Sequence, residues 1–99
     1  MGYKLKYTRQ ADKDARLLEQ AGLDEIATRL LAVIEENPCQ NPPEYEKLRG
    51  NLTGLYSRRI NKQHRMVYAV LPNTANLTDA NKEPYKGIVK IIRMWTHYE

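Results

Sequence analysis

The sequence predicts an α+β fold in which two helices pack on one face of a small, mostly antiparallel sheet. An alternating segment opens the chain, two segments with helical spacing follow it, and β-prone segments fill the second half. With 99 residues the chain is long enough for one domain and too short for two, so a single domain over residues 1–99 is expected. So small a domain buries a smaller fraction of its surface than a large domain does, and any active site should be a shallow depression.

The first strand is predicted over residues 3–7. Apolar side chains alternate there with lysines, in the order Tyr3, Lys4, Leu5, Lys6, Tyr7. Such alternation is typical of a strand with one buried face and one charged face.

Two helices should follow this strand. Thr8 can cap the first helix and Gly22 can end it. The second helix should begin at about Asp24 and stop at Asn37, because the residue before a proline resists helical geometry. Its apolar residues have clear helical spacing, namely Leu23, Ile26, Ala27, Leu30, Leu31 and Ile34.

The second half of the chain predicts three strands. Residues 55–61 and 65–71 should form a hairpin around a tight connection near Lys62 and Gln63. Residues 88–95 are rich in isoleucine and valine and should form a central strand. The polar segment 72–87 between them is predicted to be a long loop.

Charge is distributed unevenly along the chain, whose formal net charge is +4. Between residues 9 and 36, seven acidic residues outnumber four basic ones. Between residues 46 and 65 only Glu46 opposes six basic residues, a balance of +5. Such a patch indicates a surface for phosphates, and arginine is well suited to bind them. The basic residues are Lys47, Arg49, Arg58, Arg59, Lys62 and Arg65.

Several classes of protein are disfavoured by the sequence. No segment is apolar enough to cross a bilayer, the N-terminus lacks the core of a signal peptide, and Cys39 has no cysteine to pair with. His64 and His97 lack zinc-like spacing with Cys39, and Gly50 and Gly54 are too isolated for a phosphate loop. A cytoplasmic protein without membrane, metal or cofactor is therefore expected.

The remaining polar residues could cut RNA without a metal. That reaction needs a base for the 2′-hydroxyl, an acid for the leaving 5′-oxygen, and cations for the charge on the transition state. A carboxylate, a histidine and arginines are sufficient, and the basic patch and the remaining polar residues contain them, namely Glu46, His64, Arg65, His97 and Tyr98. Each also has a structural interpretation, such as a surface salt bridge or a packed strand end. The residues alone therefore predict phosphate binding and leave cleavage open.

One continuous stretch, residues 46–70, resembles the central block of the YoeB/Txe toxins of the RelE-like superfamily. It consists of EKLRGNLTGLYSRRI followed by NKQHRMVYAV. The pair His97 and Tyr98 resembles the family's closing His-Tyr pair. The resemblance implies a fold close to the microbial ribonucleases, with two helices against a small twisted antiparallel sheet. It also implies cleavage of mRNA at the ribosomal A site, a cognate antitoxin of the YefM/Axe kind, and a homodimer as a possible form of the free toxin.

The resemblance also implies roles for single residues. Glu46 would be the general base, His97 the general acid and Arg65 the group that stabilises the phosphate. Tyr98 would shape the site or stack within it. The expected contacts with RNA or the ribosome come from the basic stretch and the last strand, namely Lys47, Arg49, Arg58, Arg59, Lys62, His64, Arg93 and Trp95. A structural role for His64 stays equally open.

Three features depart from the family pattern. Trp95 stands where the family usually has a basic residue. Arg93, on the same strand parity, could supply the missing positive charge. Trp95 could instead stack on an RNA base. The loop 72–87 is longer than is usual in the family. Glu99 adds a negative charge beside the expected acid.

These departures keep a second function open, in which the toxin fold binds RNA or the ribosome without cutting. A third idea, poisoning of DNA gyrase, is disfavoured because Glu46, Arg65 and His97 are all present. An acidic antitoxin segment is expected to fold onto the basic protein, covering Arg58 and Arg59 or displacing His97 and Tyr98.

Overall fold

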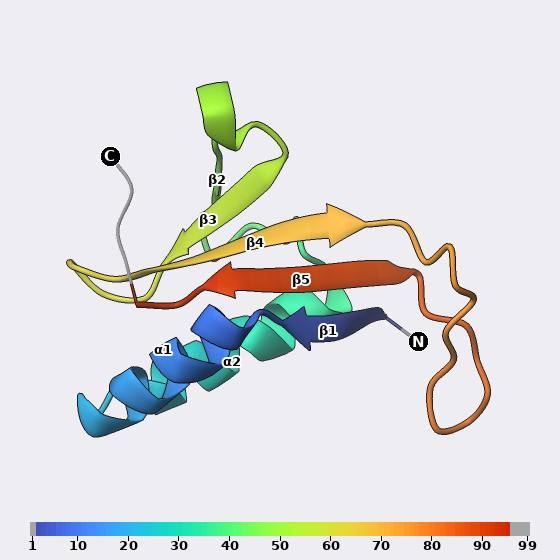
Figure 1. The fold of residues 1–99 in the computed structure, drawn as a ribbon, viewed down its shortest axis with the longest axis horizontal. Helices are drawn as coiled ribbons and strands as arrows, with labels where there is room; N and C mark the ends of the chain where they lie inside the picture. Colours follow the sequence, from blue (N-terminus) through green and yellow to red (C-terminus); the bar gives the residue numbers. More distant parts are fainter. Residues whose placement is uncertain (1, 96–99) are drawn as a thin grey trace.

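The computed structural model describes residues 2–95, so Met1 and residues 96–99 lie outside it. Strand β1 (Tyr3–Tyr7) is followed by helices α1 (Arg9–Gln20) and α2 (Asp24–Glu36). A short strand β2 (Glu46–Lys47) and a 3-10 turn, η1 (Gly50–Leu52), lead to the hairpin of β3 (Leu55–Arg59) and β4 (Arg65–Leu71). Strand β5 (Gly87–Arg93) ends the described fold (Figure 1).

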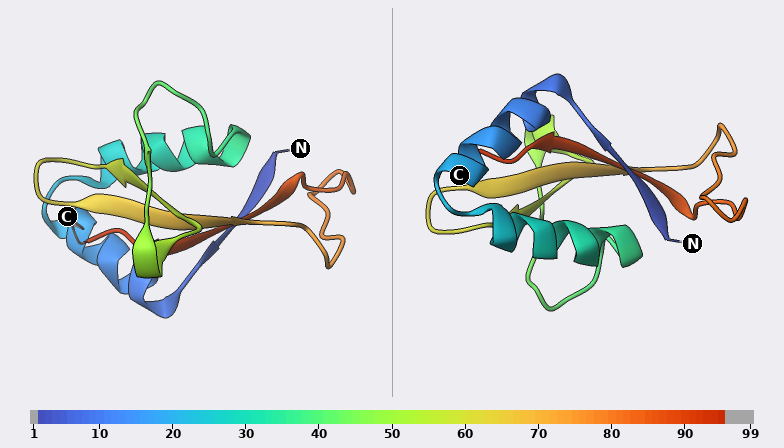
Figure 2. Two further views of the ribbon diagram at one scale, coloured as in Figure 1. Left: turned by 90° about the horizontal axis from the view of Figure 1, so that it is seen from above. Right: turned by 90° about the horizontal axis from the view of Figure 1, so that it is seen from below.

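The five strands form one sheet in the order β1-β5-β4-β3-β2. Strand β1 runs parallel to β5, and the other neighbouring pairs are antiparallel. Figure 1 shows both helices below strands β4 and β5, and Figure 2 shows the strong twist of the sheet along its strands. The predicted fold class, two helices on a mostly antiparallel sheet, is confirmed.

A single apolar core joins the helices to one face of the sheet. Residues of both helices and of strands β4 and β5 belong to it, namely Ala11, Leu18, Ala27, Leu30, Ile34, Met66, Tyr68, Val89 and Ile91. Both helices pack on the face that carries Met66 and Tyr68, so the opposite face of β3 and β4 is free of helices (Figure 1). Side chains alternate along a strand, so the residues that alternate with Met66 and Tyr68 point to that opposite face. We call this the open face.

The helix ends follow the predicted signals. The Thr8 hydroxyl accepts a hydrogen bond from the Ala11 N–H at 3.0 Å and donates one to the Ile92 carbonyl at 2.8 Å, so it caps α1 and ties it to β5. Gly22 follows the end of α1 with a φ of +73°, a conformation that glycine adopts without a steric penalty. Helix α2 ends at Glu36, before Asn37 and Pro38. Neither helix of residues 2–95 has the length and apolarity needed to cross a membrane.

The strand predictions need small corrections. The third strand ends at Arg59 rather than residue 61, since Asn61 belongs to the turn before β4. The last strand covers residues 87–93 rather than 88–95. Strand β2 was not predicted, because it has only two residues and forms by pairing with Ser57 and Tyr56.

The long loop after β4 is folded on itself. The Asn73 side chain donates to the carbonyls of Leu77 and Tyr85, at 2.9 and 3.1 Å, and accepts from the Leu77 N–H. An isolated bridge joins Thr78 to Pro84. The predicted loop is thus present and carries its own hydrogen bonds, far from the β3–β4 turn (Figure 1).

Candidate functional site

Strand register brings several predicted residues together on the open face. Glu46 of β2 is paired with Ser57 of β3, which is paired in turn with Val67 of β4. Two residues closer to the turn, and on the same face, Arg59 is paired with Arg65. On one face of a sheet, long side chains reach neighbours in the same row and also diagonal neighbours in the next row. Glu46 and Arg65, which are distant in sequence, therefore meet on this face.

An ion pair joins these two residues. Arg65 Nη2 donates to Glu46 Oε1 at 2.7 Å, and Arg65 Nε donates to the Ser57 hydroxyl at 2.6 Å. The Arg65 side chain is 13% exposed, whereas that of Glu46 is 64% exposed. The guanidinium is therefore fixed in direction while the carboxylate stays accessible to a ligand.

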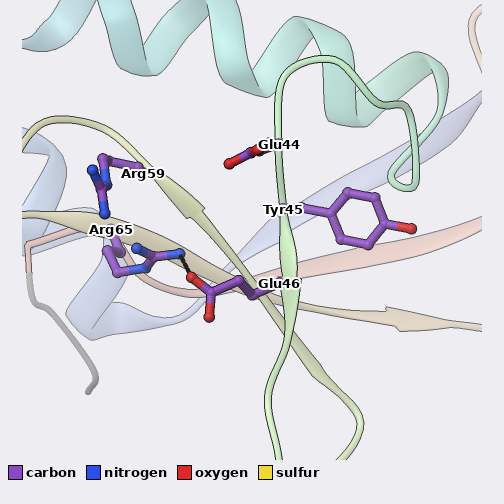
Figure 3. A pocket seen from close by; sticks show the side chains of 5 residues that line it. All are labelled: Glu44, Tyr45, Glu46, Arg59 and Arg65. Carbon is purple, nitrogen blue, oxygen red and sulfur yellow. Dashed lines mark hydrogen bonds and ion pairs between the residues drawn. The ribbon is translucent and has the colours of Figure 1, made fainter.

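A hollow of about 150 Å³ opens beside this pair. Its lining consists of Glu44, Tyr45, Glu46, Arg59 and Arg65 (Figure 3). Glu44 and Glu46 point toward the two arginines, whereas Tyr45 points the other way, as alternation along an extended segment requires. Pockets for drug-sized ligands begin at about 300 Å³. The hollow therefore suits a small chemical group, and its small size agrees with the expectation from chain length.

The two arginines of the hollow, Arg59 and Arg65, are paired across β3 and β4 and repel each other. Like charges directly opposite each other on antiparallel strands destabilise a sheet. Glu46 offsets part of the repulsion between Arg59 and Arg65 through its bond to Arg65. A phosphate between the arginines would offset more of it, because guanidinium groups bind phosphate oxygens with two parallel hydrogen bonds.

Glu44 and Tyr45 were not predicted as part of the site. Sequence parity contained a signal for Glu44, because residues two apart in an extended segment lie on the same side. No sequence pattern indicated the contacts that Tyr45 makes with residues of β3. Its ring lies 5.8 Å from that of Tyr56, and the Arg58 guanidinium lies over it at 5.1 Å, measured between centres.

Arg58 requires a correction, because it was expected to contact RNA and is fully buried. Its Nε donates to the Tyr68 hydroxyl at 3.0 Å, and its Nη1 donates to the Pro43 carbonyl at 2.6 Å. Its Nη2 donates to the carbonyls of Pro38 and Gln40, at 3.0 and 2.8 Å. Arg58 therefore holds segment 38–43 against the core, and its guanidinium does not reach the open face.

Tyr68 completes this buried network. Burial raises its pKa above 10.0, although the hydrogen bond and the charge of Arg58 oppose the shift. The hydroxyl therefore keeps its proton and donates it to the Pro38 carbonyl at 2.7 Å. This framework positions the segment that carries Glu44, Tyr45 and Glu46 into the site.

The other predicted basic residues divide into two groups. Lys47, Arg49, Arg59 and Lys62 are exposed, as contact with RNA would need. Arg93 donates through Nε to Asp14 Oδ2 at 2.8 Å and through Nη2 to the Trp95 carbonyl at 3.1 Å. Arg93 was the candidate for the charge that Trp95 replaces, and these bonds direct it to helix α1 instead.

His64 and Trp95 contact each other. Their rings are stacked with centroids 3.8 Å apart. One face of the Trp95 indole is therefore covered. His97, Tyr98 and Glu99 lie outside the described residues. Within residues 2–95, no three His, Cys, Asp or Glu side chains are grouped as metal ligands would be.

Solved structures of similar fold are toxins. A YoeB/ParE toxin from Agrobacterium tumefaciens superposes with a TM-score of 0.74 and 25% identity, covering 96% of this chain and 99% of that chain. A YoeB from Staphylococcus aureus, solved as a dimer, has a TM-score of 0.72 and 30% identity, with coverage of 99% and 100%. The YoeB–YefM complex of Staphylococcus aureus gives 0.68 and 31%, with the same coverage.

Sequence comparison gives the same family. The toxin YoeB of a Synechocystis species is 37% identical over 57 residues, which span 58% of this chain and 59% of that relative's length. The toxin YoeB of Mycobacterium bovis is 44% identical over 41 residues, spanning 41% of this chain and 48% of that relative. The model of the YoeB-like toxins of bacterial type II toxin–antitoxin systems matches residues 5–98. The chain belongs to this family of YoeB-like toxins.

Proposed function

We propose that this toxin is a ribosome-dependent, metal-independent endoribonuclease that cleaves mRNA at the ribosomal A site and so inhibits translation. The observation that carries the proposal is the Glu46–Arg65 pair, which is held at 2.7 Å at the edge of a small hollow that also contains Arg59. A carboxylate beside a fixed guanidinium and a second arginine supplies two of the three groups that RNA cleavage needs.

The proposed reaction uses the 2′-hydroxyl of the RNA as the nucleophile. Glu46 accepts its proton as the oxygen bonds to phosphorus, and the bond from phosphorus to the 5′-oxygen breaks. Arg65, with Arg59 beside it, stabilises the charge on the phosphate oxygens. His97 donates a proton to the leaving 5′-oxygen, and Tyr98 shapes the site. The roles of His97 and Tyr98 rest on the sequence resemblance.

Contact with the ribosome is assigned to the exposed basic residues of the stretch 46–65, of which Arg59 lines the hollow. Lys47, Arg49, Arg59 and Lys62 are exposed on β2, β3 and the two turns that flank them. Binding through such residues releases counterions from RNA, so it should weaken steeply as salt is added. Arg58 has no part in this surface, because all its bonds lie inside the fold.

A cognate antitoxin of the YefM kind and a homodimer are part of the proposal. They are supported by the Staphylococcus aureus relative, which was solved both with YefM and as a dimer. An acidic antitoxin segment would cover Arg59 and its exposed neighbours, or displace His97 and Tyr98. Arg58, which was also expected to be covered by the antitoxin, is buried and is not available to it.

The experiment maps the 5′ ends of an mRNA incubated with purified protein, with and without ribosomes. We expect cuts only with ribosomes, and unchanged cutting after the toxin is dialysed against EDTA. His97→Ala should abolish both the cuts and growth arrest while leaving antitoxin binding largely intact. Equal toxicity of His97→Ala and the parent would show that His97 is not the acid.

A second candidate function is binding without cleavage. It is favoured by the segment after β5, where Trp95 stands in place of the family's usual cation and is stacked on His64, and by the bond of Arg93 to Asp14. In that case the protein would co-sediment with ribosomes and arrest translation, and end mapping would find no cuts under any condition.

A further inference from the structure

The last described residues, 93–95, are held by two other parts of the fold. Arg93 Nε and the Met94 backbone N–H both donate to Asp14 Oδ2 on α1, at 2.8 and 2.9 Å. The Trp95 indole stacks on the His64 imidazole with the ring planes 20° apart. In Figures 1 and 2 the end of β5 lies beside the β3–β4 turn. The segment is therefore fixed both to helix α1 and to this turn.

Asp14 is a firm anchor because its carboxylate is ionised and fully buried. Burial by itself raises the pKa of Asp14, but hydrogen bonds from Arg93, the Met94 N–H and Gln10 outweigh it and hold the pKa below 3.8. At neutral pH the carboxylate therefore holds the chain directly after β5 through charge-assisted hydrogen bonds.

His64 is equally well held by its own turn. The Asn61 side-chain oxygen accepts from the backbone N–H groups of Gln63 and His64, at 2.9 and 2.7 Å. The His64 carbonyl accepts from the N–H groups of Ile60 and Asn61, at 2.9 and 3.2 Å. The imidazole on which Trp95 packs is thus carried by a turn with four hydrogen bonds of its own.

The stack also connects the two parts of the proposed site. His64 contacts Trp95, and the next residue, Arg65, holds Glu46. His97 follows Trp95 by two residues, so their Cα atoms are at most about 7 Å apart. Because Trp95 is fixed against His64, the chain that continues toward His97 starts from a defined point next to the turn that carries Arg65.

We propose that His64 and Trp95 are positioning residues for RNA cleavage, and that their stack fixes the point from which the chain carrying His97 leaves the fold. This inference rests on the proposed function. It gives Trp95 a role that needs no positive charge. It also assigns His64 to holding the chain rather than to proton transfer or RNA contact, since one face of its ring is covered and its Nδ1 is buried with no hydrogen-bond partner among residues 2–95.

The test compares variants that break the stack with variants that keep it. His64→Ala and Trp95→Leu remove one aromatic ring, whereas His64→Phe and Trp95→Phe keep two flat faces. Gln63→Ala is the matched control, because Gln63 is an exposed neighbour in the same turn. Each protein is first checked for the circular dichroism and unfolding midpoint of a folded chain.

Two measurements are made on each protein. Trp95 is the only tryptophan, so acrylamide quenching of its fluorescence reports the stack directly in the His64 variants. We expect stronger quenching in His64→Ala than in the parent or in His64→Phe. Ribosome-dependent cleavage should lose about 10- to 100-fold in kcat in His64→Ala and Trp95→Leu, with little change in KM, because a small displacement of a catalytic group has costs of this size. His64→Phe and Trp95→Phe should recover most of the loss.

Other results would overturn the inference. If His64→Phe were as impaired as His64→Ala, the imidazole nitrogens would matter and the stack would not be its role. If His64→Ala exposed Trp95 to acrylamide and still cleaved like the parent, the stack would not position His97. A parent protein that cut no mRNA would overturn the proposed function, and positioning for cleavage with it, whatever the fluorescence showed.

Discussion

Arg58 and Arg59 are neighbours in sequence and lie on opposite faces of strand β3. Arg58 is fully buried and donates four hydrogen bonds, whereas Arg59 is exposed and lines the hollow beside Glu46 and Arg65. Two identical side chains thus serve the framework on the core face and the proposed chemistry on the open face. The difference shows that charge alone does not indicate a binding residue, since strand parity decides which face it joins.

The largest effect is expected from Arg58→Met. This substitution leaves carbonyls of segment 38–43 and the Tyr68 hydroxyl without their donor, and each buried unsatisfied group is costly. We expect a loss of about 3–4 kcal/mol in the free energy of unfolding, measured by urea denaturation. A loss below about 1 kcal/mol would mean that the core-face network is not a framework.

Arg65→Lys should separate charge from geometry on the open face. Lysine keeps the positive charge but cannot donate in fixed directions to both Ser57 and Glu46 as Arg65 does. We expect a fall of about 10²-fold in ribosome-dependent cleavage, the usual cost of losing one fixed donor to a transition state. Urea denaturation supplies the control, because the unfolding free energy should change far less than in Arg58→Met. Full activity in Arg65→Lys would reduce the role of Arg65 to charge alone.

Asp14 is a second buried charged residue, and like Arg58 it is expected to stabilise the fold. Asp14→Asn should lower the free energy of unfolding by about 2 kcal/mol at pH 7, because charge-assisted bonds to Arg93 and Met94 are weakened. The pKa of Asp14 is depressed in the folded protein, so its stabilisation is complete above 3.8 and is lost as the pH falls below that value. Urea denaturation between pH 3 and pH 7 should show the parent and variant converging at the acid end. A constant difference across this range would contradict the assignment.

The smallest effect on stability is expected from Arg59→Ala. Its side chain is exposed and opposes Arg65, so the unfolding free energy should change by no more than about 0.5 kcal/mol. Ribosome binding measured against salt should nevertheless weaken, with the log–log slope reduced by about 1. Binding with an unchanged slope would remove Arg59 from the RNA surface.

Local sequence patterns predicted most of the fold. The alternation of residues 3–7, the Thr8 cap, Gly22 and Asn37-Pro38 each act over a few residues, and the elements they define are present. Strand β2 was missed because its two residues become a strand only by pairing with Ser57 and Tyr56. Interactions between distant segments are not encoded in local periodicity.

The site was predictable only where a motif or parity pointed to it. The resemblance named Glu46 and Arg65, and the structure brings them within 2.7 Å. Arg58 and Arg59 were both expected to contact RNA, because the sequence does not show which of them turns inward. That choice depends on the carbonyls of segment 38–43 that bind Arg58. The contact of His64 with Trp95 and the bond of Arg93 to Asp14 join distant elements, and no local pattern indicated them.

The central claim is that side chains of the open face are needed for RNA cleavage but contribute little to the free energy of unfolding. Substitution of Glu46 tests this claim most directly. The measurement is ribosome-dependent mRNA cleavage by Glu46→Gln and by Glu44→Gln, a matched carboxylate that lines the same hollow. We predict a fall of about 10²- to 10⁴-fold for Glu46→Gln, as for a lost general base, and less than about 10-fold for Glu44→Gln. Because the Glu46 carboxylate is 64% exposed, the unfolding free energy of both variants should stay within about 1 kcal/mol of the parent. Undiminished cleavage by Glu46→Gln, or equal losses in the two variants, would contradict the account.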